Sequence, residues 1–289
     1  MPLTAEQREA RRLGIGGSDA AAVVGRHPYV TPLALWLDKV HGREVVENER
    51  MEWGNRLESA IREAASDSIG ESVSVPPDTF THPLTPIMRA NVDGILESGR
   101  ILECKNIDQL AWRMADDDLV DGVLKHHWYQ VQHYAEVLDA PGAVVAYLVG
   151  GNDLQLRHVE RDRTFGKALR LREAAWWQKH IVGNVPPENG TPDDRMSLLE
   201  RLHARESAGM LQTSDVDLVA LARQYEAASK AIEAANAHRD GIKADLCSVI
   251  GAAEGLDFGK AIGKVTWKAN KHGSRTLRVS LRDAQEQGQ

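Results

Sequence analysis

Apolar positions recur at intervals of three and four residues in four segments of the chain, and each such segment predicts an amphipathic helix. The segments are residues 32–40, 51–69, 125–138 and 161–181. Thr31 before Pro32 predicts the start of the first helix, because Thr is a good N-cap and Pro suits the first turn. The residues expected to face the core are Leu33, Trp36, Leu37, Trp53, Leu57, Ala60, Ile61, Ala64, Trp128, Val131, Ala135, Leu138, Leu169, Leu171, Trp176 and Trp177.

Strand-like patterns lie between these helices. Residues 143–149 are almost wholly apolar, as in a buried strand, and residues 154–160 alternate as a partner strand would. Val92–Leu96 and Arg100–Cys104 flank a short connection that contains Gly99, which is typical of a β-hairpin. The order of hairpin, helix and strand predicts an α/β (α+β) fold with a central mixed sheet flanked by helices.

The composition changes at Gly183–Asp194, where glycines, prolines and acidic residues gather. We therefore expect two domains, residues 1–190 and a C-terminal extension of residues 191–289. From Ser214 onward, apolar or small residues recur in steps of three and four, interrupted at Arg239. This repeat predicts a coiled-coil-like arm or an antiparallel helix pair.

The last part of the chain predicts two strands around a turn at residues 271–274. Residues 260–282 contain seven Lys or Arg, no acidic residue and one aromatic residue, Trp267. In an acidic protein, a local basic segment of this kind favours a contact with nucleic acid over a generic solvated surface. The candidate DNA-binding side chains in it are Lys264, Lys268, Lys271 and Arg275.

Composition narrows the function classes. The chain is 42% hydrophobic and 27% charged, and no apolar run approaches the roughly 18–20 residues that span a membrane. Its first residues are charged and lack the apolar core of a signal peptide, so we expect a cytoplasmic protein without a membrane partner. Cys104 and Cys247 lie far apart, which excludes a disulfide framework and a zinc ribbon. The net charge of −7 argues against a protein that coats nucleic acid, but a nuclease is compatible with it.

The predicted hairpin carries the strongest candidate chemistry. Asp93 lies on one strand, and Glu103 and Lys105 lie on the other with their side chains on the same face, because side chains alternate along a strand. Two carboxylates held close together favour a divalent cation, and hard oxygen ligands suit Mg²⁺ or Mn²⁺. A metal beside a lysine can cleave a phosphodiester, since the metal activates water and the lysine orients it or stabilises charge.

For several other residues that could belong to a functional site, the sequence pattern alone leaves the role undecided. Residues 4–12 predict a short helix, and the following glycine-rich turn leads to Ser18 and Asp19, which predict the N-cap of a helix over Ala20–Val24. This turn, with Arg12 just before it, is as consistent with a simply capped helix as with an anion site. Glu58 lies beside the apolar stripe of its helix, where a solvated glutamate is the favoured interpretation. Gln130 and Gln132 fall on different helix faces, so at most one of them would reach the site.

Five segments in order resemble one family. They are RLGIGGSD (12–19), EWGNRLE (52–58), NVDG (91–94), LECK (102–105) and WYQVQHYAEVL (128–138). Together they resemble the YqaJ-type viral recombinases, which are relatives of phage lambda exonuclease within the PD-(D/E)xK nuclease superfamily. The likeness covers roughly residues 10–185, and five ordered motifs are far more specific than the D…ExK pattern alone. Val92 replaces the usual proline before the Asp, which affects turn geometry and leaves the ligands in place.

The resemblance implies a role for each matching residue. Glu58, Asp93 and Glu103, with the backbone carbonyl of Cys104, would bind one or two Mg²⁺ (or Mn²⁺) ions. Lys105 would assist the attacking water, and Gln130 matches the family's active-site glutamine. The implied site for the terminal 5′-phosphate consists of Arg12 and Ser18.

The resemblance also implies an activity and partners. The activity would be Mg²⁺-dependent 5′→3′ digestion of double-stranded DNA from free ends, leaving 3′ single strands for a partner annealing protein in recombination. The protein would be phage- or prophage-encoded and act in the bacterial cytoplasm as a homo-oligomeric ring, often a trimer in relatives. Two alternatives remain: a structure- or sequence-specific endonuclease with the same metal site, and a non-catalytic DNA-binding or assembly module.

Overall fold

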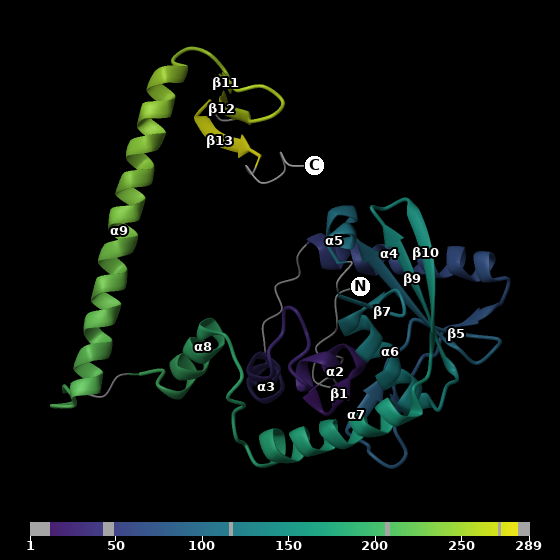
Figure 1. Ribbon diagram of the computed structural model, residues 1–289. Helices are drawn as coiled ribbons and strands as arrows, with labels where there is room; N and C mark the ends of the chain where they lie inside the picture. Colours follow the sequence, from purple (N-terminus) through teal and green to yellow (C-terminus); the bar gives the residue numbers. More distant parts are fainter. Residues whose placement is uncertain (1–11, 43–48, 116–117, 206–208, 271–272, 283–289) are drawn as a thin grey trace. The chain divides into compact units, whose positions relative to one another are not determined.

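The computed structural model describes residues 12–42, 49–115, 118–205, 209–270 and 273–282, without the side chains at 50 and 51. The chain forms two compact units, Met1–Glu206 and Ser207–Gln289 (Figure 1). The domain division expected after residue 190 stays a prediction. The helix expected over residues 4–12 lies outside the described residues except at Arg12.

A five-stranded mixed sheet forms the centre of the first unit, with the strand order β10-β9-β6-β5-β2. The strands β5 and β6 pair as the predicted antiparallel hairpin, closed at Gly99 with a φ of 76°. The strand β6 runs parallel to β9, which pairs antiparallel with β10 as expected. The strands are β2 (Val73–Ser74), β5 (Gly94–Leu96), β6 (Ile101–Ile107), β9 (Gly142–Val149) and β10 (Asp153–Glu160).

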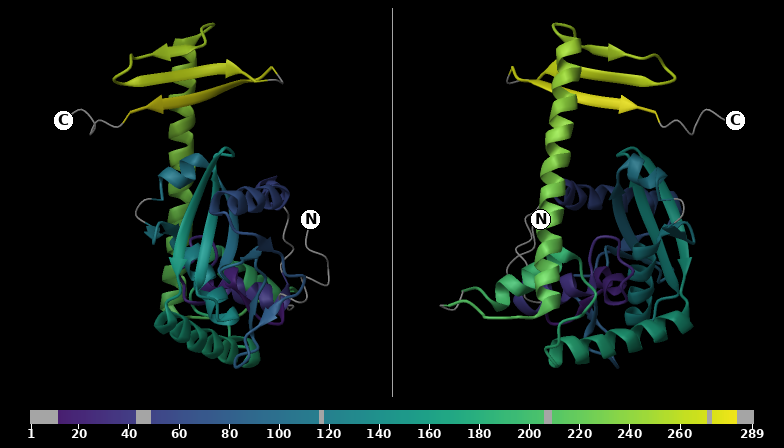
Figure 2. Two further views of the ribbon diagram at one scale, coloured as in Figure 1. Left: turned by 90° about the vertical axis from the view of Figure 1, so that its right-hand side faces the viewer. Right: turned by 60° about the vertical axis from the view of Figure 1, so that its left-hand side comes forward.

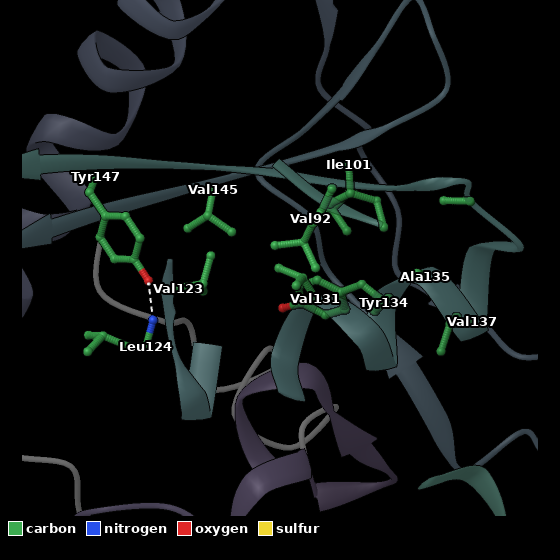
Figure 3. Close-up of a cluster of buried hydrophobic side chains, with 14 of the residues drawn as sticks. Val92, Ile101, Val123, Leu124, Val131, Tyr134, Ala135, Val137, Val145 and Tyr147 are labelled. Atoms are coloured by element: carbon green, nitrogen blue, oxygen red, sulfur yellow. Dashed lines mark hydrogen bonds between the residues drawn. The ribbon is translucent and has the colours of Figure 1, made fainter. Parts of the chain in front are cut away.

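Helices cover both faces of this sheet, as the sequence predicted (Figures 1 and 2). On one face, Ile61 and Ala65 of α4 (Glu49–Ile69) pack against Leu102 and Val144. On the other face, α6 (Lys125–Leu138) packs its apolar side chains on β6 and β9 (Figure 3). Alternation along β6 therefore directs Leu102 and Cys104 toward α4, and Glu103 and Lys105 toward α6.

Two more helix groups pack around α6. They are α2 (Gly17–Val23) with α3 (Pro32–His41), and α7 (Arg163–Trp176), which continues as a π-helical turn, η2 (Trp177–Val182). The sequence predicted α3 well, with Thr31 as N-cap and Gly42 as C-cap. The smaller elements of this unit are β1 (Ile15–Gly16), β3 (Phe80–Thr81), β4 (Met88–Ala90), α5 (Gln109–Arg113), β7 (Leu119–Val120), β8 (Val123–Leu124) and α8 (Pro192–Leu202).

Several expectations about the N-cap of α2 and about core positions of this unit are wrong in detail. The N-cap of α2 is Gly16 rather than Ser18 or Asp19, and Asp19 instead accepts a hydrogen bond from the Gly16 N–H at 3.0 Å. Trp53 is 54% exposed and Leu171 is 59% exposed, and Ala60 and Ala64 are exposed as well, so none of these four residues contributes to the core. Period alone does not fix where a helix stripe ends, and Trp53 lies beyond the part of α4 that meets the sheet.

The second unit contains one long helix and a small sheet. The helix α9 (Val216–Ile250) runs unbroken for 35 residues, so the alternative of an antiparallel helix pair within this segment is wrong (Figure 2). The sheet has three strands rather than the two predicted: β11 (Gly255–Asp257), β12 (Gly263–Ala269) and β13 (Arg275–Leu281). No helix in the described part of the chain has the length and hydrophobicity that a membrane span requires.

Candidate active site

The β5–β6 hairpin brings together the carboxylates that the sequence singled out. Asp93 directly precedes β5, and its Oδ2 accepts a hydrogen bond from the backbone N–H of Cys104 at 2.7 Å. Glu103 is 2% exposed, and its Oε1 lies 2.7 Å from Nζ of Lys105. The expectation that Glu103 and Lys105 share a face of the strand is therefore confirmed.

The helix α6 contributes a glutamine to this group. Nε2 of Gln130 donates to Oε1 of Glu103 at 2.7 Å and to the hydroxyl of Tyr134 at 3.1 Å. Gln132 lies on another face and donates to the carbonyl of Glu160 at 2.8 Å. Only one of the two glutamines reaches the carboxylates, as their spacing predicted.

Glu58 approaches from α4. Its carboxylate lies 3.1 Å from Nη1 of Arg62, and the same nitrogen donates to the backbone carbonyl of Asp93 at 3.0 Å. Arg62 therefore ties the helix that carries Glu58 to the start of the carboxylate hairpin. The charge of Glu58 raises the pKa values of Asp93 and Glu103, although burial and nearer groups have larger effects on both. Glu58 therefore belongs to the same electrostatic site.

Burial and charge crowding shape the protonation of the site. Burial, together with the neighbouring charge of Glu103, raises the pKa of Asp93 to about 8. Burial also raises the pKa of Glu103, while Lys105 opposes this shift. Burial lowers the pKa of Lys105, but Glu103 and Asp93 outweigh it and raise that pKa above its usual value. Acids whose pKa values are raised in this way are typical of a site that gathers negative charge for a cation.

The carboxylates fit a divalent cation chemically, although they do not form a complete cage. Oε2 of Glu103 is buried and has no hydrogen-bond partner among the described residues, so an oxygen is left for a ligand. Within the described ranges, no three His, Cys, Asp or Glu side chains are grouped closely enough to hold a metal. The carboxylates are engaged by other side chains instead: Lys105 and Gln130 share one oxygen of Glu103, and Arg62 pairs with Glu58. Hard carboxylate oxygens are the donors that Mg²⁺ and Mn²⁺ accept.

The predicted phosphate residues have other contacts. Arg12 donates from Nε and Nη2 to the carbonyls of Lys39 and Val40, at 3.0 and 2.8 Å, and so caps the C-terminal end of α3. Ser18 is exposed on α2, next to Asp19, which pairs with Nζ of Lys39 at 2.6 Å. The role of Arg12 and Ser18 in holding a phosphate stays a prediction.

The basic side chains of the second unit are also partly engaged. Arg275 stacks on the Trp267 ring at 3.7 Å and donates to the carbonyl of Gly251 at 2.7 Å, and Lys268 pairs with Glu254. Lys264 is exposed on β12, and Lys271 lies outside the described residues. DNA binding by this segment stays a prediction.

Two residues of the site escaped the sequence analysis. Arg62 lies four residues after Glu58, and Tyr134 lies four residues after Gln130, so both are helix neighbours of a named residue. That spacing was a usable signal. A cavity of about 550 Å³ lies elsewhere, between the end of α2, α7, η2 and residues 185–189, and none of the hairpin residues lines it.

Comparison with known proteins supports the resemblance. Residues 7–141 match the YqaJ-like viral recombinase domain. The uncharacterized protein YqaJ of Bacillus subtilis (strain 168) is 30% identical over 219 residues, which are 74% of this chain and 66% of that protein. The chain thus spans a little less than two thirds of that relative.

Two solved structures are similar in fold. The alkaline exonuclease LHK-Exo from Laribacter hongkongensis superposes with a TM-score of 0.50 at 18% identity, covering 69% of this chain and 98% of that one. LHK-Exo in complex with dAMP gives a TM-score of 0.51 at 18% identity, covering 70% and 98%. At this identity the likeness shows the fold alone, and it confirms the predicted α/β core with a mixed sheet flanked by helices.

Proposed function

Residues 7–141 belong to the YqaJ-like viral recombinase domain family, and from this membership we propose that the chain is a metal-dependent 5′→3′ exonuclease acting on double-stranded DNA. One observation carries the proposal. Asp93, Glu103, Lys105 and Gln130 converge at the β5–β6 hairpin with Glu58 beside them, which is an arrangement that suits metal-dependent phosphodiester hydrolysis.

Each residue has a part in this proposal. Asp93, Glu103, Glu58 and the carbonyl of Cys104 would hold one or two Mg²⁺ ions, which would polarise the phosphoryl oxygen and lower the pKa of a bound water. Gln130 fixes the carboxylate of Glu103 through its hydrogen bond of 2.7 Å. Lys105 points its ammonium at Glu103, and its side chain is 24% exposed, so it would be accessible to a water and to the scissile phosphate.

The direct test follows the ends of the DNA. Linear duplex labelled at either 5′ or 3′ end is incubated with the protein in Mg²⁺ and in EDTA, and the products are separated on a gel over time. We expect shortening from the 5′ end only, and only with Mg²⁺. Covalently closed circular duplex degraded as fast as linear duplex would favour the endonuclease alternative, and no cleavage of either would favour the non-catalytic module.

The 5′-phosphate role proposed for Arg12 has its own test. Arg12→Ala is expected to slow digestion most on 5′-phosphorylated ends, because the lost guanidinium is the charge proposed to bind that phosphate. Equal losses on phosphorylated and hydroxyl ends would refute phosphate capture and would fit loss of the α3 cap instead.

We further propose the cellular setting that this activity suits. The 3′ single strands would pass to an annealing protein in recombination, and the enzyme would be phage- or prophage-encoded and act in the cytoplasm of a bacterial host. A homo-oligomeric ring such as a trimer would keep the enzyme on its DNA. Light scattering coupled to size-exclusion chromatography measures the mass, and a monomer at all concentrations would contradict the ring.

A further inference from the structure

Four aromatic rings form a continuous group beside the proposed site, on the loop after α2 and at the start of α6. We call them the ring cluster: His27, Tyr29, His126 and His127. The ring of His126 lies 5.2 Å from that of His27, 6.3 Å from that of Tyr29 and 4.1 Å from that of His127, between centroids. The cluster therefore joins two segments that are about 100 residues apart in sequence.

The inner end of the ring cluster reaches β9, the strand beside the one that carries Lys105. Nδ1 of His127 lies 2.9 Å from the hydroxyl of Tyr147, which also accepts a hydrogen bond from the Leu124 N–H (Figure 3). Tyr147 is the register partner of Lys105 across the parallel β6–β9 pair. The charge of Lys105 acts on both His126 and His127, so the rings lie within electrostatic range of its ammonium.

The outer end of the ring cluster is open to solvent. Tyr29 is 84% exposed, so its ring contributes almost nothing to the hydrophobic core. The backbone of Tyr29 and Val30 donates to Nδ1 of His27, at 3.1 and 3.0 Å, which holds the loop and its rings in place. Tyr29 is an exposed aromatic ring on a fixed loop, and it is joined through His126 to the surroundings of Lys105. A ring in this position is placed to bind a ligand.

A metal does not account for this group of histidines. Nδ1 of His27 and Nδ1 of His127 are both engaged in hydrogen bonds, and within the described ranges no three potential ligands are grouped to hold an ion. Nδ1 of His126 is buried without a hydrogen-bond partner among those residues. The ring of His126 is thus held by packing against its neighbours, and its buried nitrogen stays unsatisfied, which is unfavourable. This is expected where the aromatic face of a histidine is what binds a ligand.

We propose that the ring cluster binds the terminal nucleotide of the DNA strand at the cleavage site, with Tyr29 and His126 stacking on its base. This inference rests on the proposed nuclease function. Stacking suits an enzyme that digests any sequence, because every base presents an aromatic face while hydrogen-bond readout would discriminate among them. The short path through Tyr147 places the stacked base near the phosphate that Lys105 would contact.

The experiment reads stacking without cleavage. A linear duplex with 2-aminopurine as its 5′-terminal base is titrated with the full-length protein in EDTA, and fluorescence and affinity are recorded. Wild-type protein should quench the probe. Tyr29→Ala and His126→Ala should each weaken end binding by about 5- to 150-fold, which corresponds to the roughly 1–3 kcal/mol of one base–aromatic stack, and should reduce the quenching.

Controls separate stacking from other contacts. Tyr29→Phe keeps the ring and should bind as wild type does, and Tyr225→Ala removes an exposed tyrosine of α9 and should have no effect. A duplex whose 5′-terminal nucleotide is abasic should bind wild type and Tyr29→Ala equally. Thermal melting checks that each variant is folded.

Two results would overturn the inference. One is unchanged affinity and quenching in both alanine variants. The other is an equal loss of affinity on normal and abasic ends, which would indicate contacts to the DNA backbone. The nuclease proposal is tested separately, by incubating linear duplex with wild-type protein, and it fails if the duplex is not digested. A wild type that digests ends but shows no quenching would refute only the stacking.

Discussion

Gly17 offers a sharp test of how the helix α2 supports the site. A Cβ placed on Gly17 would lie 2.4, 2.7 and 2.9 Å from three ring carbons of Tyr134. Ordinary carbon contacts are about 3.5–4.0 Å, so in Gly17→Ala the buried Tyr134 ring must move by roughly 1 Å. Its hydroxyl accepts from Gln130, which in turn holds Glu103, so the displacement reaches the proposed catalytic carboxylate.

Two opposing effects set the size of the change. Alanine is the better helix former by about 1 kcal/mol in a helix interior, but Gly17 is the first residue of α2, so only part of this would stabilise the variant. Overpacking of a close-packed core costs about 1–3 kcal/mol and acts in the other direction. We expect Gly17→Ala to lower the free energy of unfolding by about 1–2 kcal/mol and Tm by roughly 2–8 °C. Nuclease activity should fall further than stability alone explains.

The assay pairs urea unfolding with initial digestion rates on linear duplex. Gly16→Ala is the matched control, because its Cβ would meet only Oδ2 of Asp19 at an ordinary 3.7 Å. Adding Tyr134→Leu should shrink the effect of Gly17→Ala, since the two side chains share the contact. A Gly17→Ala protein as stable as wild type would refute the steric reasoning, and a destabilised variant with undiminished activity would refute the path through Gln130.

Three further predictions address the site and its surroundings. Lys105→Ala should lower cleavage by about 10²- to 10⁴-fold and leave DNA binding intact, and cleavage at the wild-type rate would show that its assignment is wrong. Arg62→Met should raise the Mg²⁺ concentration needed for half-maximal cleavage by about 10- to 100-fold, because Arg62 binds both Glu58 and the Asp93 carbonyl. An unchanged Mg²⁺ dependence would contradict this role of Arg62. Burial, with the charges of His27 and Lys105, lowers the pKa of His126 from 6.5 to about 4. Between these two pH values the unfolded chain is protonated at His126 and the folded protein is not, so the free energy of unfolding should fall as the pH drops from 6.5 toward 4. Urea unfolding across this range should show a weaker pH dependence in His126→Gln, and an equal dependence in both proteins would argue against His126 as a source.

The sequence predicted the parts of the fold that local patterns determine. The hairpin follows from Gly99 and its flanking strands, and the bounds of α6 agree with the apolar stripe on Lys125–Leu138. The convergence of Glu103 and Lys105 follows from strand alternation. These features need only information within a few residues of each position.

Other features depend on contacts that local sequence does not reveal. The sequence predicts a glycine-rich turn before Ser18, yet Gly17 is helical, and it must be small because Tyr134, 117 positions later, packs against it. The strand β11 was missed because Gly255–Asp257 is too short to show a pattern and exists through its pairing with β12. The ring cluster likewise depends on a fold that brings residues 27 and 126 together.

The parallel pairing of β6 with β9 has a consequence for the order of synthesis. A parallel neighbour requires a crossover, and here α5, β7, β8 and α6 lie between the two strands in sequence. A nascent chain that ends after the hairpin holds its acidic residues, but it lacks both Gln130 and the strand that fixes Glu103. The site can therefore assemble only after Val149, about halfway along the 289 residues, has left the ribosome. Products truncated before this strand would lack the proposed capacity to cut DNA.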